Sequence, residues 1–247
     1  PSGISSEIII KTWLFRKKFN ISPFLIIDDL YKLNKINNFL NLNAKFQIIN
    51  KIDDAVKIFK NSIPVIDLKA KINSPLGLPD SKNSKYVIES IKRAFEFIIN
   101  NKVSGMLTLP VCKKTLKKYK FDYPGQTEFL SHLVQMKTGK KQSEIMIMST
   151  SKPIDRGKNL IVGLMTTHIP FKEIHKNINK GIIEEKLQSF KRSLCSIWGF
   201  KNPRIAVTSL NPHAGENGLI GKEEVEILNP LIKKLKKKMS ITGPISG

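Results

Sequence analysis

Two histidines stand where a side chain can bind a ligand, because each directly follows an apolar run. His168 comes after residues 160–165, and His213 comes after residues 205–210. In open α/β sheets, ligands bind at the carboxyl ends of the strands, where loops converge and helix N-termini carry partial positive charge. Neutral imidazole binds zinc, cobalt, nickel or iron, so the pair predicts a metal site. For either histidine taken alone, a hydrogen-bonded structural role is the alternative.

The loop that contains His213 has the composition of a segment that approaches a ligand closely. Asn211 can fix the entry to the loop, and Gly215 and Gly218 allow the backbone to come near a bound group before the next helix begins. Glu216 could orient an imidazole or remain solvated, and the sequence leaves both roles open.

A second candidate site lies at the start of an expected helix, at residues 125–128. Backbone N–H groups at a helix N-terminus bind phosphate or carboxylate, and Thr127 adds a hydroxyl donor next to Gln126. Helix capping by Thr127 explains the same residues without a ligand. The remaining histidines, His132 and His175, fall on expected helices, and we interpret both as surface residues.

The elements that must position these residues follow an α/β pattern. Short β-branched runs alternate with amphipathic stretches, which is typical of a largely parallel sheet whose strands are apolar on both faces. Strands are expected at residues 24–27, 46–49, 63–66, 106–109, 144–148, 160–166 and 204–209. Apolar residues at helical spacing predict helices through residues 87–98, 128–137, 183–197 and 225–239. Pro230 predicts a kink or a restart in the last of these helices.

Length and composition indicate a folded protein with two domains. The chain has 247 residues, of which 40% are hydrophobic, and we place the domains at residues 1–120 and 121–247. No apolar run approaches the roughly 20 residues of a membrane span, and no secretory pattern is visible, so we expect a cytoplasmic protein. Cys112 and Cys195 suggest two buried, reduced thiols rather than a disulfide framework.

The formal net charge of +22 would ordinarily indicate a polyanionic partner. The lysines are scattered, however, and only residues 233–238 form a dense group. Those lysines fall on the polar faces and near the C-terminus of an expected helix, where the helix dipole favours cations. We therefore interpret the charge as solvated surface and expect neither a nucleic-acid nor a membrane partner.

Short segments along nearly the whole chain resemble the 4-hydroxythreonine-4-phosphate dehydrogenase family, which acts in pyridoxal phosphate (vitamin B6) biosynthesis. The most specific segment is residues 211–216, Asn-Pro-His-Ala-Gly-Glu, followed by Gly221, Glu223 and Glu224. Further segments that are similar to family motifs, in chain order, are residues 1–7, 64–67, 108–113, 124–129 and 166–170.

The resemblance implies a fold, a reaction and a set of site residues. The fold would be two α/β/α domains around a cleft, as in isocitrate and isopropylmalate dehydrogenases, in a homodimer whose site is shared between subunits. His168 and His213 would bind a divalent metal such as zinc, magnesium or cobalt, and Gln126 and Thr127 would bind the substrate phosphate. The enzyme would use NAD or NADP to oxidise 4-phosphooxy-L-threonine to 2-amino-3-oxo-4-phosphooxybutanoate, which decarboxylates to 3-amino-2-oxopropyl phosphate.

Departures from the family pattern keep alternatives open. The family's third metal ligand belongs to a Tyr-His-Asp-Gln-Gly motif that lies beyond residue 247, so the chain could be an inactive fragment. Gln126 stands where the family has histidine, and an amide cannot act as acid or base, so another phosphorylated hydroxy acid could be the substrate. A basic nucleic-acid-binding protein is the alternative of a different class. No Gly-x-Gly-x-x-Gly fingerprint identifies the residues that bind the cofactor.

Overall fold

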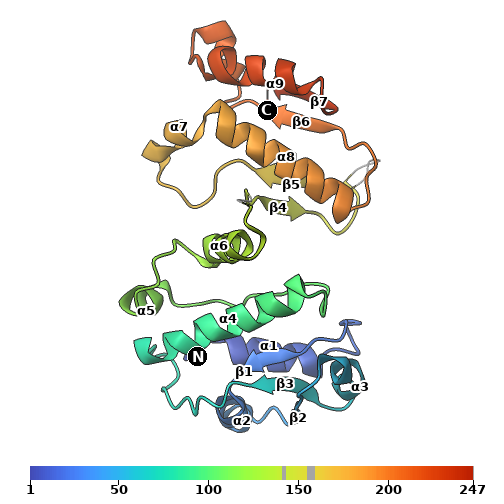
Figure 1. Ribbon diagram of the computed structural model, residues 1–247, viewed down its shortest axis with the longest axis vertical. Coiled ribbons are helices and arrows are strands. Elements are labelled where there is room, and N and C mark those ends of the chain that lie inside the picture. Colours follow the sequence, from blue (N-terminus) through green and yellow to red (C-terminus); the bar gives the residue numbers. More distant parts are fainter. Residues whose placement is uncertain (141–142, 155–158, 247) are drawn as a thin grey trace. The chain divides into compact units, whose positions relative to one another are not determined.

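The computed structural model describes residues 1–140, 143–154 and 159–246, and the chain divides into two compact units (Figure 1). The N-terminal unit is Pro1–Leu133 and the C-terminal unit is Val134–Gly247. Each unit combines helices with strands, so the α/β class is confirmed. The domain boundary expected between residues 120 and 121, and the cleft between domains, stay predictions.

A parallel sheet forms the centre of the N-terminal unit. Its strands are β1 (Ile26–Asp28), β2 (Phe46–Ile48) and β3 (Ile63–Asp67), in the order β1-β3-β2. The middle strand carries the most buried residues, because Ile63 and Val65 are fully inaccessible to solvent. The three strands expected in this region are confirmed, with ends that differ by no more than two residues.

Helices cover this sheet and give the unit its apolar core. The helical segments are α1 (Ser5–Leu14), α2 (Leu30–Phe39), η1 (Ile52–Asp54), α3 (Ala55–Phe59), η2 (Ser81–Asn83), α4 (Ser84–Ile99), α5 (Lys113–Lys118) and α6 (Gln126–Thr138), whose last residues belong to the C-terminal unit. Ile10 and Trp13 of α1 and Leu33 of α2 pack on the strands. A separate cluster joins α4, α5 and α6 through Ile91, Leu116 and Phe129.

Asp29, directly after β1, holds the segment that follows β3. Its carboxylate is 1% exposed and accepts the N–H of Lys32 at 2.9 Å, which caps α2. The same carboxylate accepts the N–H groups of Ala70 and Lys71, both at 2.8 Å, and of Ile72 at 3.1 Å. Because charged acceptors make strong hydrogen bonds, this one side chain ties the carboxyl ends of β1 and β3 together.

The expected strand at residues 106–109 is wrong. These residues have no strand assignment in the structure, and Leu107 is 85% exposed, whereas Met106 packs on the cluster of α4, α5 and α6. An apolar run becomes a strand only where a neighbouring strand completes its backbone hydrogen bonds. Within the described ranges, no strand pairs with this segment.

The C-terminal unit contains two strand pairs, so the largely parallel sheet is only partly confirmed. β4 (Met146–Ser149) pairs antiparallel with β5 (Ile161–Leu164), and β6 (Ile205–Thr208) pairs parallel with β7 (Ile241–Ile245). Burial of the strands on both faces is wrong for β4, whose Met146 and Met148 are exposed. Figure 1 shows α8 (Lys180–Ser196) returning from the end of β5 to the start of β6.

The last helix of this unit restarts near Pro230, as expected. A π-helical turn, η5 (Glu224–Leu228), leads directly into α9 (Asn229–Leu235), which has Pro230 in its first turn. The other helical segments of the unit are η3 (Phe171–Glu173), α7 (Ile174–Asn177) and η4 (Ala214–Gly218). The lysines of residues 233–238 are exposed, which confirms that they form a solvated face.

Two further expectations concern the cysteines and the membrane. Both cysteines are free, but Cys112 is exposed and Cys195 is half-buried, so the expected burial of Cys112 is wrong. Cys112 precedes α5 at the surface, where no apolar layer covers it.

Across the described ranges, no helix is both long enough and apolar enough to span a bilayer.

An ion pair between α8 and α9 makes the stability of the C-terminal unit depend on pH. The Lys234 ammonium lies 2.8 Å from the Glu184 carboxylate, and its hydrogen bond lowers the pKa of Glu184 below the usual value. A carboxylate with a lowered pKa stabilises the folded state above its ordinary pKa, and the stabilisation is lost as the pH falls through the lowered pKa. We therefore expect Glu184→Gln to lower the Tm slightly at pH 7, by a difference that shrinks as the pH falls below the ordinary pKa of a glutamate.

Thermal unfolding followed by circular dichroism, measured from pH 7 down to pH 3, checks this expectation. Glu185→Gln is the matched control, because Glu185 is the exposed neighbour on the same helix. A Tm difference that grows toward low pH would contradict the assignment. Added salt should shrink the difference at pH 7, because the pair is at the surface.

Candidate functional site

The loop after β6 presents His213 to solvent through specific backbone contacts. The Asn211 side-chain oxygen accepts the His213 N–H at 2.9 Å and the Gly215 N–H at 3.4 Å. The His213 side chain is 65% exposed, and its Nδ1 lies 3.2 Å from Glu216 Oε1. A carboxylate that holds one ring nitrogen fixes the orientation of the imidazole, so Nε2 is the nitrogen then able to bind a metal ion. Of the two roles left open for Glu216, this contact favours the orienting one.

The backbone of this loop is strained. Five successive residues have positive φ: Ala214 (50°), Gly215 (71°), Glu216 (43°), Asn217 (58°) and Gly218 (100°). The left-handed conformation costs a non-glycine residue roughly 1–2 kcal/mol. Such strain persists only where the surroundings impose it, and it is concentrated at ligand sites. The sequence indicated the glycines but not the strain at Ala214 and Glu216.

His168 lies in the exposed loop between β5 and η3 of the same unit, with a φ of 54°. Both candidate metal ligands therefore follow strands of one unit, as expected. Within residues 1–140, 143–154 and 159–246, no group of three or more His, Cys, Asp or Glu side chains could hold a metal ion. The two imidazoles fit a metal by their chemistry, but they supply only part of a coordination shell.

The candidate phosphate site at the start of α6 is assembled from two segments of the N-terminal unit. Gln126 Nε2 donates to the Leu109 carbonyl at 3.4 Å, and Gln126 Oε1 is buried without a hydrogen-bond partner among the described residues. A Cβ at Gly125 would lie 3.7 Å from Lys113 Nζ and 3.1 Å from Glu128 Oε2. The absence of a side chain at Gly125 therefore lets an ammonium and a carboxylate lie beside the helix N-terminus. In the sequence, Lys113 is recognisable only as the last residue of the family-like segment 108–113.

The remaining residues that the sequence analysis considered are Thr127, His132 and His175. Thr127 is exposed in the first turn of α6, where its hydroxyl could reach either a ligand or the helix backbone. His132 is half-buried, and its ring centroid lies 5.3 Å from that of Tyr123, so it is not a simple surface residue. His175 is exposed, as expected.

Comparison with known families shows which family the chain belongs to. The family described as pyridoxal phosphate biosynthetic protein PdxA matches residues 20–247, which is most of the chain and includes all four candidate site residues. The chain belongs to this family.

Individual members of the PdxA family are similar along the whole chain. The 4-hydroxythreonine-4-phosphate dehydrogenase of Wigglesworthia glossinidia brevipalpis is 34% identical, over 100% of this chain and 70% of that protein. The same enzyme of a strain of Methylorubrum extorquens is 30% identical, over 99% and 69%. The crystal structure of the Klebsiella pneumoniae enzyme superimposes with a TM-score of 0.83 at 30% identity, over 100% of this chain and 72% of that chain. The mixed α/β fold is therefore that of solved PdxA structures.

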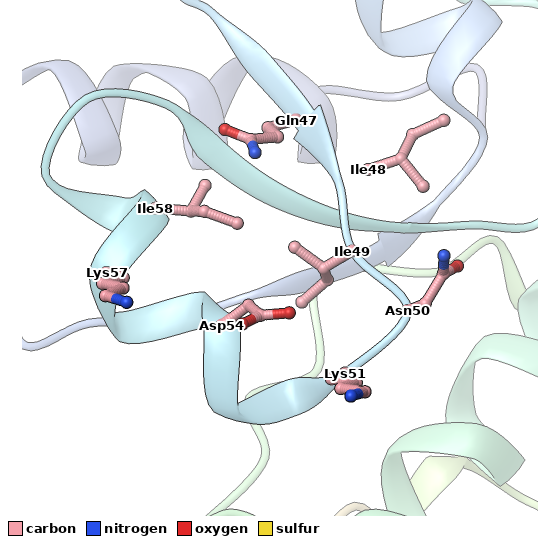
Figure 2. Close-up of a pocket in the computed structure, with 8 residues that line it drawn as sticks. All are labelled: Gln47, Ile48, Ile49, Asn50, Lys51, Asp54, Lys57 and Ile58. Carbon is pink, nitrogen blue, oxygen red and sulfur yellow. The ribbon is translucent and has the colours of Figure 1, made fainter.

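Two hollows lie on the N-terminal unit, and one of them is lined by Ile66 and Asp67 of the family-like segment 64–67. One, of about 520 Å³, is shown in Figure 2, where the Asp54 side chain points toward Ile49. The other, of about 660 Å³, lies between α4 and the carboxyl ends of β2 and β3. Neither is lined by Gln126 or Thr127, so we give neither hollow a role in the chemistry.

Proposed function

We propose that the full-length protein is a metal-dependent dehydrogenase that uses NAD or NADP to oxidise 4-phosphooxy-L-threonine. The secondary alcohol loses a hydride to the nicotinamide and a proton to solvent, which gives 2-amino-3-oxo-4-phosphooxybutanoate. That keto acid loses carbon dioxide to form 3-amino-2-oxopropyl phosphate. The observation that carries the proposal is the PdxA family match over residues 20–247, supported by relatives with this named activity.

In this proposal, each candidate residue has a binding or positioning role. His168 and His213 bind the divalent metal, and Glu216 orients His213 through Nδ1. When bound, the metal supplies positive charge that lowers the pKa of the substrate alcohol and stabilises the developing carbonyl. Gln126, Thr127 and the first N–H groups of α6 hold the substrate phosphate. We also propose a cytoplasmic homodimer with a site shared between subunits.

Gln126 favours a second candidate, a dehydrogenase of the same chemistry acting on another phosphorylated hydroxy acid. Its amide donates to Leu109 and leaves one acceptor oxygen without a partner among the described residues. An amide binds a phosphate through its N–H groups, but it adds no positive charge as a protonated histidine would. Position 126 therefore offers less positive charge here than in a family member with histidine, which favours a substrate of lower negative charge.

NADH fluorescence tests the proposal directly. We expect NADH to form when 4-phosphooxy-L-threonine, NAD and zinc, magnesium or cobalt are added to the full-length protein, and a chelator should abolish the signal. Residues 1–247 alone serve as the comparison, because their described part contains no group of three or more metal-ligand side chains that could hold the ion. A faster reaction with another phosphorylated hydroxy acid would support the second candidate, and no turnover of any of them would contradict both.

A further inference from the structure

Glu224 is a buried carboxylate that lies beneath the His213 loop. It is the first residue of the π-helical turn η5 and is 1% exposed. Its Oε1 accepts the N–H of Leu210 at 3.0 Å, at the point where the loop leaves β6. Its Oε2 is buried and makes no hydrogen bond to any described residue. The neighbouring acidic residues Glu223 and Glu226 are exposed.

The second contact of Glu224 is with the strained part of the loop. A Cβ placed on Gly215 would lie 2.8 Å from Glu224 Oε2 and 2.9 Å from the Gly221 carbonyl. The Gly215 backbone therefore lies directly against the carboxylate, at a distance that no other residue type permits. Glu224 contacts the loop on both sides of His213, at Leu210 and at Gly215.

Stability alone does not account for this side chain. Burying a carboxylate is costly unless several donors compensate it, and among the described residues only one backbone N–H does so here. An apolar residue would fill the same space at a lower cost. This costly buried carboxylate lies against the strained segment that contains His213. Its presence is therefore better explained by an effect on the conformation of that segment than by a contribution to stability.

We propose that Glu224 is a positioning residue that fixes the His213 loop for ligand binding. The carboxylate holds the start of the loop through Leu210 and limits the approach of Gly215. It thereby sets the directions in which the side chains of His213 and Glu216 extend from the backbone. The part of this inference that concerns metal binding rests on the proposed function, whereas the part that concerns the loop does not.

Hydrogen exchange of the Leu210 amide, measured by NMR on the ¹⁵N-labelled chain, tests the loop contact. We expect Glu224→Ala to accelerate this exchange about tenfold or more, because the amide loses a charged acceptor. Glu224→Gln keeps an acceptor oxygen and should restore most of the protection. Glu226→Ala is the matched control on the same turn and should change nothing. The Ile205 amide, which donates to Ser240 at 2.9 Å, reports on the core and should exchange as in the unmodified protein.

Two results of the exchange measurement on Glu224→Ala would overturn the proposal. One is unchanged exchange at Leu210 in Glu224→Ala, and the other is an equal acceleration at Leu210 and Ile205, which would indicate general destabilisation. If Glu224→Ala does not fold, Gly215→Ala and Gly218→Ala decide. Both residues have positive φ, but a Cβ at Gly218 meets only the Lys222 side chain at 4.0 Å. Faster Leu210 exchange in Gly215→Ala alone supports the proposal, and equal behaviour of the two variants contradicts it.

A cobalt titration of the full-length protein, followed by visible absorption, tests the link to ligand binding. We expect Glu224→Ala to weaken cobalt binding about tenfold, with Glu224→Gln close to the unmodified protein. Unchanged cobalt affinity in a variant whose Leu210 amide exchanges faster would overturn the positioning role. If the unmodified protein binds no cobalt, the proposed role of His168 and His213 as cobalt ligands fails, and the exchange data still decide whether Glu224 fixes the loop.

Discussion

Replacing His213 with alanine is expected to lower chelator-sensitive NADH formation by the full-length protein at least about a hundredfold. Loss of a residue that only orients a metal ligand typically costs roughly 10–100-fold, so loss of a ligand should cost at least as much. The His213 side chain is 65% exposed and contacts Glu216 through Nδ1. Its removal should therefore leave the fold intact, and the effect should appear in turnover rather than in stability.

The measurement is steady-state turnover at saturating NAD, with circular dichroism spectra to confirm folding. His175→Ala is the matched control, because His175 is also exposed and belongs to the same unit. That variant should retain full activity. Turnover of His213→Ala within a few-fold of the unmodified protein would rule out His213 as a metal ligand.

Replacing Gly243 with alanine is expected to destabilise the C-terminal unit by about 3 kcal/mol or more, which is a large part of the stability of an ordinary domain. A Cβ at this position would lie 2.3 Å from the Val207 carbonyl of β6. The residue also has a φ of 126°, which costs an alanine roughly 1–3 kcal/mol. The β6–β7 register shifts between Ala206 and Thr208, so the backbone is already irregular where the new methyl group would have to fit.

Urea unfolding followed by circular dichroism measures this loss. Gly199→Ala is the matched control in the same unit, because Gly199 also has positive φ, 70°, but a Cβ there meets no described atom within 4 Å. The control should cost only the strain of the left-handed conformation, about 1–2 kcal/mol. Equal losses in the two variants would show that β6 can move away from the new methyl group.

Much of the fold could be predicted from the spacing of apolar residues. α4 and α8 follow helical stripes, and the restart at Pro230 follows from the ring of proline, which cannot continue the hydrogen-bond ladder. The strand at residues 106–109 could not be excluded from the sequence, because an apolar run does not show whether a partner strand lies beside it. For the same reason, the antiparallel pairing of β4 with β5 was not foreseen.

The candidate site was predictable as residue types but not as contacts. His213 and Glu216 are three residues apart in a loop, and the sequence could not decide whether their side chains meet. Glu224 directly precedes an apolar stripe and looks like its exposed neighbours Glu223 and Glu226. Glu224 lies four residues before the buried Leu228, so ordinary helical spacing is compatible with a buried position. A stripe drawn through apolar residues begins instead at Val225, which is 44% exposed, and so it passes over the buried carboxylate.

The strand order β1-β3-β2 constrains how the N-terminal unit can be built. The last strand to be synthesised occupies the middle of the sheet and supplies the backbone partners of both others. Until residue 67 has left the ribosome, β1 and β2 therefore lack their native partner. All the pairings of this sheet join distant parts of the sequence, a feature that slows folding because chain entropy is lost before any contact forms. The nascent unit thus depends on its helices, rather than its strands, for early structure.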